Sequence, residues 1–143
     1  MAFENPTRER IKELLEQPGN IAVVGLSDNP DKVSHMVAAA MQTRGYRIIP
    51  VNPNADTILG EKSYASLSDI PEPVHIVNVF RRPETVVPVA EEAVKIKANV
   101  FWLQQGIVNE EAAQICQAAG LEVIMDRCIK VEDAVLQPKL SVN

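Results

Sequence analysis

A short polar segment after an apolar run carries the residues best suited to chemistry. Gly25, Ser27, Asn29, Lys32 and Ser34 follow the run IAVV and precede a helical pattern. Backbone amides, hydroxyls and an ammonium group at the start of a helix can together hold a phosphate. Plainer explanations stay open beside that one, because the glycine could serve a simple turn, the lysine could be solvated and Ser34 could cap the helix.

The end of the second apolar run bears on the kind of nucleotide. Sites for NAD usually carry an acidic residue there, which accepts a hydrogen bond from the ribose, whereas this chain has Asn52 and Pro53. The loop also lacks the motif G-x-G-x-x-G, since Ser27 replaces the middle glycine. A neutral amide tolerates a ribose phosphate, and Arg81 and Arg82 follow the third run. A phosphorylated adenosine therefore fits better than NAD.

Further candidates follow the later apolar runs. Phe80 would pack against a ligand or in the core, and Trp102 is predicted to be a core residue rather than a stacking platform. Gln104, Gln105 and Gly106 offer two side-chain amides and a backbone that a ligand could approach. The geometry of entry into the next helix would also explain these three residues.

The histidines and cysteines give little support for catalysis. His35 and His75 have no nucleophile or carboxylate partner visible in the sequence. Cys116 reads as a core residue, and Cys128 as an inert, buried thiol beside Arg127. We therefore predict no catalytic residues and no metal site.

Five apolar runs alternate with helical patterns. We expect strands at residues 21–24, 46–51, 74–79, 99–103 and 121–125. A first helix is expected at residues 5–17, opened by Pro6 after Asn5, and a second from a cap at Asp31 to Gly45. The second helix would bury Val33, Met36, Val37, Ala40 and Met41. Two more would follow Pro83 and Asn109, while residues 52–68 show no strong periodicity.

This alternation is typical of a single Rossmann-like α/β domain, with a five-stranded parallel sheet and helices on both faces. We predict the strand order 3-2-1-4-5, which would place a ligand near strands 1 and 4. The chain of 143 residues has room for one domain, with a core at residues 20–133 and a flexible tail at 134–143.

Composition excludes several classes of protein. Hydrophobic residues make up 46% and charged residues 23%, a balance that neither disorder nor a membrane span would produce. The net charge of −5 gives no support for binding to nucleic acid or to an anionic membrane. The polar amino end and the two cysteines predict a cytoplasmic protein without a disulfide framework.

Co-linear segments resemble the small CoA-binding proteins related to the CoA-binding domain of succinyl-CoA synthetase α subunits and of ADP-forming acyl-CoA synthetases. The resemblance spans about residues 20–133. It is carried by VVGLSDNPDKVSHMVA, GYRIIPVNP, ILGEKSYASLSDIP, VNVFRRPETVVPV, FWLQQGIVNEEAA and AGLEVIMDRCIKVE. The family usually has alanine where Leu26 stands, which would add bulk near the pocket.

The resemblance implies a site for CoA or an acyl-CoA. In such a site the phosphates would meet Gly25, Ser27, Asn29, Lys32 and Ser34, and the adenosine would lie by Asn52 and Pro53. Phe80 and Arg81 would border the ligand, with Arg82 beside them, and Gln104, Gln105 and Gly106 would meet pantetheine. A less favoured hypothesis gives Cys128 a mixed disulfide with the CoA thiol.

The related synthetases phosphorylate a histidine in a further domain, and the sequence offers no such domain. We therefore predict a binding module for CoA or its thioesters, acting as a carrier, a sensor or a partner of an acyl-CoA enzyme. One alternative is an NAD(P)-binding oxidoreductase. Another is an interaction subunit without a nucleotide, which would present an exposed apolar patch instead.

Overall fold

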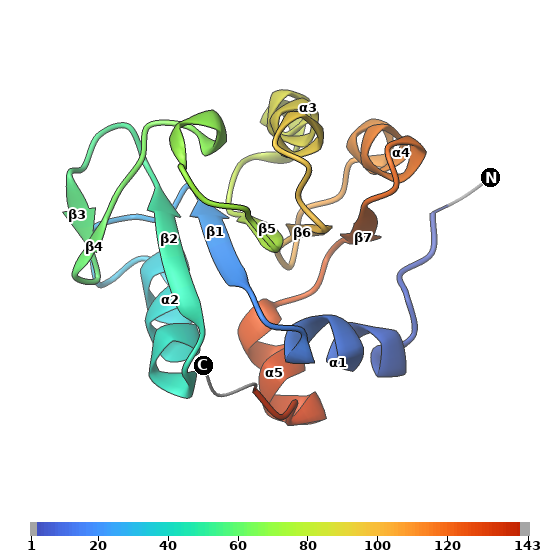
Figure 1. Cartoon of the computed structure of the whole chain (residues 1–143), viewed down its shortest axis with the longest axis horizontal. Coiled ribbons are helices and arrows are strands. Elements are labelled where there is room, and N and C mark those ends of the chain that lie inside the picture. Colours follow the sequence, from blue (N-terminus) through green and yellow to red (C-terminus); the bar gives the residue numbers. More distant parts are fainter. Residues whose placement is uncertain (1–2, 141–143) are drawn as a thin grey trace.

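The computed structural model describes residues 3–140, in which a parallel sheet lies between two layers of helices (Figure 1). The five strands of this sheet are β1 (Asn20–Val24), β2 (Arg47–Val51), β5 (Ile76–Val79), β6 (Val100–Leu103) and β7 (Glu122–Ile124). All neighbouring pairs are parallel, so the carboxyl ends of the strands meet at one edge. The predicted α/β fold is confirmed.

Each face of the sheet has its own apolar core. Helices α1 (Arg8–Glu16), α2 (Val33–Arg44) and α5 (Ile129–Leu136) cover one face, and α3 (Val87–Lys95) and α4 (Glu110–Ala118) cover the other (Figure 1). Successive residues of β6 supply both cores, because Phe101 belongs to the α3–α4 side and Trp102 to the opposite side. Trp102 and Cys116 are fully buried, which confirms them as core residues.

The predicted strand order is wrong. The sheet has the order β2-β1-β5-β6-β7. The third of its strands in chain order, β5, therefore pairs with β1 instead of lying beyond β2. Pro50 gives the physical reason, because it lies within β2 and has no N–H for a second neighbour, as suits an edge strand. The strand order therefore changes direction between β1 and β5, and not between β1 and the fourth strand as predicted. In open parallel sheets a ligand site lies at such a point, at the carboxyl edge.

The connection from β2 to β5 contains structure that the sequence pattern did not indicate. Two short strands, β3 (Thr57–Ile58) and β4 (Glu61–Lys62), form an antiparallel hairpin, and a 3-10 turn, η1 (Leu67–Asp69), follows. The Tyr64 amide donates to the Pro50 carbonyl oxygen, and the Asn52 amide donates to the Tyr64 carbonyl oxygen. This connection thereby covers part of the outer edge of β2.

The helix ends differ from the predicted ones. Thr7, not Asn5, caps α1, because its side chain accepts a hydrogen bond from the Arg10 amide. Lys32, not Asp31, is the residue at the N-cap of α2. On α2 the predicted apolar face is only partly correct, since Val33 and Met36 are 61% and 49% exposed.

Helix α5 was missed, and it includes the first residues of the predicted tail. The preceding residue offers no side-chain cap, so the sequence carried no start signal. Beyond the helix, Pro138 accepts a hydrogen bond from the Arg44 guanidinium, and the Lys139 amide donates to Glu16. Residues 141–143 of the predicted tail lie outside the described residues.

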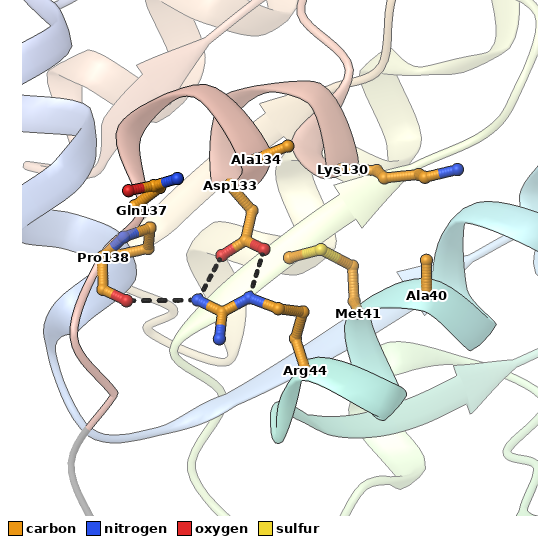
Figure 2. A pocket seen from close by; sticks show the side chains of 8 residues that line it. All are labelled: Ala40, Met41, Arg44, Lys130, Asp133, Ala134, Gln137 and Pro138. Carbon is orange, nitrogen blue, oxygen red and sulfur yellow. Dashed lines mark hydrogen bonds and ion pairs between the residues drawn. The ribbon is translucent and has the colours of Figure 1, made fainter.

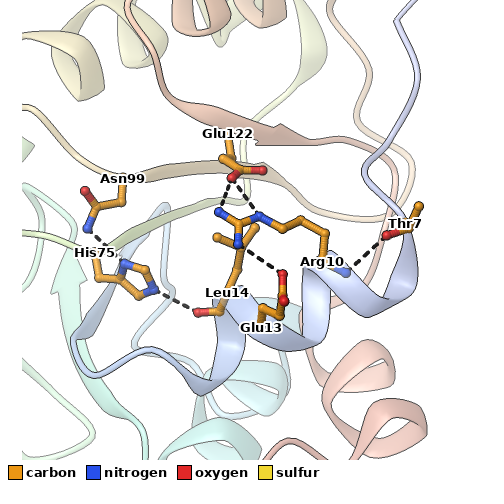
Figure 3. A network of polar contacts seen from close by, with 7 residues as sticks. All are labelled: Thr7, Arg10, Glu13, Leu14, His75, Asn99 and Glu122. Carbon is orange, nitrogen blue, oxygen red and sulfur yellow. Dashed lines mark hydrogen bonds and ion pairs between the residues drawn. The ribbon is translucent and has the colours of Figure 1, made fainter.

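Polar contacts at the amino edge of the sheet hold α1 in place (Figure 3). His75 Nε2 lies 2.8 Å from the Leu14 carbonyl oxygen, and its Nδ1 lies 3.0 Å from the side-chain Nδ2 of Asn99. On the same helix, the Arg10 guanidinium donates to Glu122, which holds the pKa of Arg10 above its usual value. His75 thus serves as a structural contact, far along the strands from the carboxyl edge.

Candidate functional site

The turn after β1 depends on Gly25. Its φ angle is 85°, and its amide donates to the Val51 carbonyl oxygen at 3.0 Å. A Cβ atom at this position would lie 2.2 Å from the Phe80 carbonyl oxygen and 3.5 Å from Arg81 Nε. The ends of β1, β2 and β5 therefore meet at a residue that must lack a side chain.

The loop between β1 and α2 is ordered by its own polar side chains. The Ser27 amide donates to Ser34 Oγ, and the Asn29 amide donates to Ser27 Oγ, both at 3.0 Å. His35 Nδ1 lies 2.8 Å from the Ser27 carbonyl oxygen. The interpretation of Ser34 as a local cap is wrong, because it lies second in α2 and holds the loop instead.

The amino end of α2 is open to an anion. Lys32 provides no side-chain cap, and the first turn contains no acidic residue. The first amides of an α-helix have no partner within the helix, and the helix dipole makes this end positive. Lys32 and Asn29 are exposed beside it, together with the acidic residues Asp28 and Asp31.

Asn52 joins the end of β2 to the same loop. Its Nδ2 donates to the Leu26 carbonyl oxygen at 2.9 Å, and its Oδ1 accepts from the Asn54 amide. Pro53 next to it is exposed. Leu26 is 0% exposed and packs in the core on the α2 side, so its bulk lies in the protein interior rather than near the loop.

The structure distinguishes the two arginines after β5. The Arg81 guanidinium lies over Gly25, as the 3.5 Å separation from the position of a Cβ atom shows. Arg82 is exposed and lies 3.6 Å from the Glu84 carboxylate. Phe80 is half-buried against the core on the α2 side, and its amide donates to the Val24 carbonyl oxygen. Only Arg81 therefore faces the turn.

Gln104 has a structural task at the end of β6. Its Oε1 accepts from Asn78 Nδ2 and from the Ile129 amide, both at 3.3 Å. Gln104 therefore caps the first residue of α5 although it follows β6, far away in the sequence. Gln105 is exposed. Gly106 has a φ angle of 86°, and its amide donates to Asp126 Oδ1 at 2.7 Å.

Cys128 and Cys116 have different surroundings. Cys128 precedes α5 and is half-buried against the core. Cys116 is fully buried, and burial raises the pKa of its thiol to about 12. The predicted environment of Cys116 is confirmed, whereas the reactivity of Cys128 stays a prediction.

The candidate residues form one cluster and one extension. Gly25, Ser27 and Ser34 lie together with Asn52 on one side and Phe80 and Arg81 on the other, around the β1–β5 boundary. The extension contains Gln105 and Gly106, which follow β6, and Cys128, which follows β7. These strands lie one and two positions beyond β5 along the same edge. Within residues 3–140, no group of three metal-ligating side chains lies close enough to bind a metal ion.

A separate cavity lies between α2 and α5 (Figure 2). It has a volume of about 480 Å³ and is lined by Met41, Arg44, Asp133 and Pro138, among others. The Arg44 guanidinium donates to both Asp133 oxygens, and the Tyr46 hydroxyl donates to Asp133 Oδ1 at 2.8 Å. The pKa of Tyr46 is raised, mainly because the hydroxyl is buried and secondly because it donates to the Asp133 carboxylate.

Two structural contacts were not predicted from the sequence. Asn78 interrupts the otherwise apolar strand IVNV, a signal that could have revealed a polar partner such as Gln104. Asn5 reaches across the fold, where its side chain donates to the Met125 carbonyl oxygen and accepts from the Met125 amide. No local pattern could reveal that contact, because the two residues are 120 positions apart.

Together, the parallel sheet and the glycine turn between β1 and α2 define a doubly wound α/β domain, a class in which ligands generally bind at the carboxyl edge of the sheet. A family model described as a CoA binding domain matches residues 19–134, and the chain belongs to this family. It is 57% identical over 133 residues to YneT, an uncharacterized protein of Bacillus subtilis (strain 168), covering 93% of this chain and 98% of that one.

A second relative is much longer than this chain. An ADP-forming acetate–CoA ligase of Methanocaldococcus jannaschii is 32% identical over 126 residues, which cover 82% of this chain but 18% of the ligase. The match thus concerns one part of that enzyme.

Solved structures agree with the fold. A hypothetical protein from Pyrococcus horikoshii OT3 superimposes with a TM-score of 0.89 at 34% identity, covering 96% of this chain and 99% of the other. An acetyl-coenzyme A synthetase from Ca. Korarchaeum cryptofilum has a TM-score of 0.70 at 24% identity, covering 80% of this chain and 27% of that one, and shows the fold alone. Within residues 3–140, no helix is long and apolar enough to cross a membrane.

Proposed function

We propose that this protein binds CoA or an acyl-CoA at the carboxyl edge, with phosphates at the start of α2. The observation that carries the proposal is the uncapped, acid-free first turn of α2, which follows a glycine turn over which Arg81 lies. Membership of the CoA binding domain family supports this choice of ligand.

Local charge supports an anionic ligand although the chain has a net charge of −5. Among residues 3–140, neither Lys32 nor Arg81 forms an ion pair with a carboxylate, while six other ion pairs engage arginines elsewhere. Asp28 and Asp31 offset part of this positive charge. Lys32 lies at the N-cap of α2 and Arg81 lies beside the Gly25 turn that precedes this helix, so these cations and the helix dipole favour a phosphate bound between the turn and the helix.

The proposed role is binding without chemistry. His35, the histidine beside the loop, contacts the Ser27 carbonyl oxygen and has no carboxylate partner within the described chain. Asn52 stands where an NAD site would have an acidic residue, and its amide is already committed to holding the loop. A carrier, a sensor or a partner of an acyl-CoA enzyme fits these features.

Isothermal titration with CoA, dephospho-CoA and NAD tests the proposal. Micromolar CoA binding is expected, with weaker binding of dephospho-CoA and still weaker binding of NAD. Lys32→Ala should weaken CoA binding about tenfold, the effect of losing about 1.4 kcal/mol. Lys95→Ala removes an exposed cation from the far end of α3 and should change nothing. If the protein binds none of the three nucleotides, the proposal is wrong.

A protein contact is a second candidate function. Four exposed apolar side chains, Val33, Met36, Val131 and Val135, lie on the neighbouring helices α2 and α5. The cavity of Figure 2 lies between the same helices. Self-association at this patch would appear as a concentration-dependent mass in light scattering, and Met36→Glu would reduce it.

A further inference from the structure

We infer that the acyl group of a bound acyl-CoA lies in a groove beside the end of β7, and that this groove selects uncharged acyl groups over those ending in a carboxylate. The inference rests on the proposed function, because it extends the CoA site along the same edge of the sheet. It concerns the chemical class of the thioester, which the family description leaves open.

The groove is lined by both apolar and charged side chains. Its volume is about 460 Å³, and its apolar lining includes Phe3, Val108 and Met125. Val108 is 50% exposed, which leaves an apolar side chain uncovered at the start of the α4 region. A short acyl chain would cover it and remove apolar surface from water.

The wall of the groove is fixed before any ligand binds. The Asn5 side chain bonds both the amide and the carbonyl oxygen of Met125, at 2.8 and 2.9 Å. The Phe3 amide donates to Glu110 Oε1 at 3.3 Å. These contacts hold the segment before α1 against the end of β7, so the cavity does not depend on a movable loop.

The groove adjoins the candidate residue Gly106. Asp126 lines the groove, and its Oδ1 accepts from the Gly106 amide in the loop after β6. A Cβ atom at Gly106 would have no neighbour within 4 Å, so the space over this loop is open. A ligand that crosses Gly106 therefore arrives at the groove.

The length of pantetheine matches this path. Twelve bonds separate its phosphate oxygen from its sulfur, as many as in four residues of a peptide, which span about 14 Å when extended. From β1 the edge passes β5 and β6 to β7, in the order that the sheet shows. These three steps between strands also measure about 14 Å. A phosphate at α2 would thus place the thioester at the groove.

The charged lining residues determine which acyl groups the groove favours. Glu4, Glu110 and Asp126 line the groove, whereas Arg127 is the one cation among its lining residues. The Arg127 guanidinium donates to the Asp126 carbonyl oxygen at 2.8 Å, which occupies one of its donors. A carboxylate at the end of an acyl group would meet a lining with a net negative charge, whereas a hydrocarbon end could pack against Val108 and Phe3.

Titration with CoA, butyryl-CoA and succinyl-CoA tests the inference. Butyryl-CoA should bind about fivefold more tightly than CoA, and succinyl-CoA several-fold more weakly than butyryl-CoA. Val108→Glu should remove the advantage of butyryl-CoA and leave CoA binding unchanged. Val131→Glu is the matched control, because Val131 is 49% exposed on α5 and does not line the groove. Glu4→Lys should raise the affinity for succinyl-CoA.

The outcomes separate the two proposals. If CoA binds but the three ligands have equal affinities, the groove does not hold the acyl group and the CoA site stands. The same conclusion follows if Val108→Glu and Val131→Glu have the same effect on the affinity for butyryl-CoA. If none of the ligands binds, the CoA site itself fails and this inference with it. Val108 and Val131 are about half exposed and Glu4 is exposed, and circular dichroism will verify that the three variants are folded.

Discussion

The Phe80 carbonyl oxygen lies 2.2 Å from the place that a Cβ atom on Gly25 would occupy. The Phe80 amide in turn donates to the Val24 carbonyl oxygen at 2.9 Å, so β5 continues its pairing with β1 up to the glycine. The backbone of one strand therefore fills the space that a side chain on the other would need. This contact lies between β1 and β5, where the strand order changes direction, and Arg81 lies beside it.

Gly25→Ala should lower the free energy of unfolding by about 3 kcal/mol, because the methyl group displaces the Phe80 backbone in a region that cannot relax. Gly120→Ala is the control, since its φ angle is also positive, at 89°, but no atom lies within 4 Å of the added Cβ. Its cost should be about 1 kcal/mol. Equal costs in urea denaturation would contradict the role assigned to the Phe80 contact.

Asn52→Asp should weaken CoA binding more than it weakens dephospho-CoA binding. The substitution removes the donor to the Leu26 carbonyl oxygen and brings a negative charge to the end of β2. Repulsion acts most on the ligand that carries the additional phosphate. Asn54→Asp, two residues further and exposed, should have a smaller effect in the same titration. Similar losses for both ligands would place the ribose phosphate elsewhere.

Gln104→Leu should lower the free energy of unfolding by about 2 kcal/mol, because the Ile129 amide and Asn78 Nδ2 lose their shared acceptor in a buried setting. Gln105→Leu should change it by less than about 0.5 kcal/mol, since Gln105 is exposed. Thermal or urea unfolding distinguishes the two variants. A stable Gln104→Leu protein would show that water can replace the side-chain oxygen.

Under native conditions one thiol per chain should react with Ellman's reagent. Cys128 is half-buried, whereas the fully buried Cys116 has a pKa of about 12 and stays protonated at neutral pH. Cys128→Ser should abolish the reaction and Cys116→Ser should preserve it. Saturating CoA should slow the labelling if pantetheine passes the end of β7. Reaction of two thiols at one rate would contradict the assigned burial.

Tyr46→Phe should lower the free energy of unfolding at pH 7 by about 2 kcal/mol, through loss of the hydrogen bond to Asp133. Because the folded state raises the pKa of Tyr46, its contribution is complete below pH 10 and is lost as the pH rises further. Urea denaturation above pH 10 should therefore show a shallower decline for the variant than for the wild type. Tyr64→Phe is the matched control, because it removes a half-buried tyrosine hydroxyl that does not contact Asp133.

The sequence indicated those parts of the fold that follow from local chemistry. Each of the five predicted strands exists, and Asn109 caps α4 as expected, because its side chain accepts from the Ala112 amide. The order of the strands depends on pairing between distant segments. Pro50 carried the relevant signal, but hydrophobic periodicity does not record the number of neighbours that a strand has.

The candidate site was predictable to the extent that it is contiguous in sequence. The loop from Gly25 to Ser34 lies at the carboxyl edge as predicted, and its internal hydrogen bonds involve the same polar side chains. Gln104 illustrates the limit, because its partner Ile129 belongs to a helix that the sequence did not reveal. The Arg81 contact with Gly25 likewise depends on β5 lying beside β1.

The contacts of α1 bear on the order in which the molecule is assembled. Although it is the first helix of the chain, α1 bonds His75, Glu122 and Glu132, and the segment before it bonds Met125. The contacts with Met125, Glu122 and Glu132 join residues more than 110 positions apart, so they cannot form until β7 and α5 have been synthesised. A chain stopped before α5 would therefore keep the contact of α1 with His75 but lose its ion pair with Glu132.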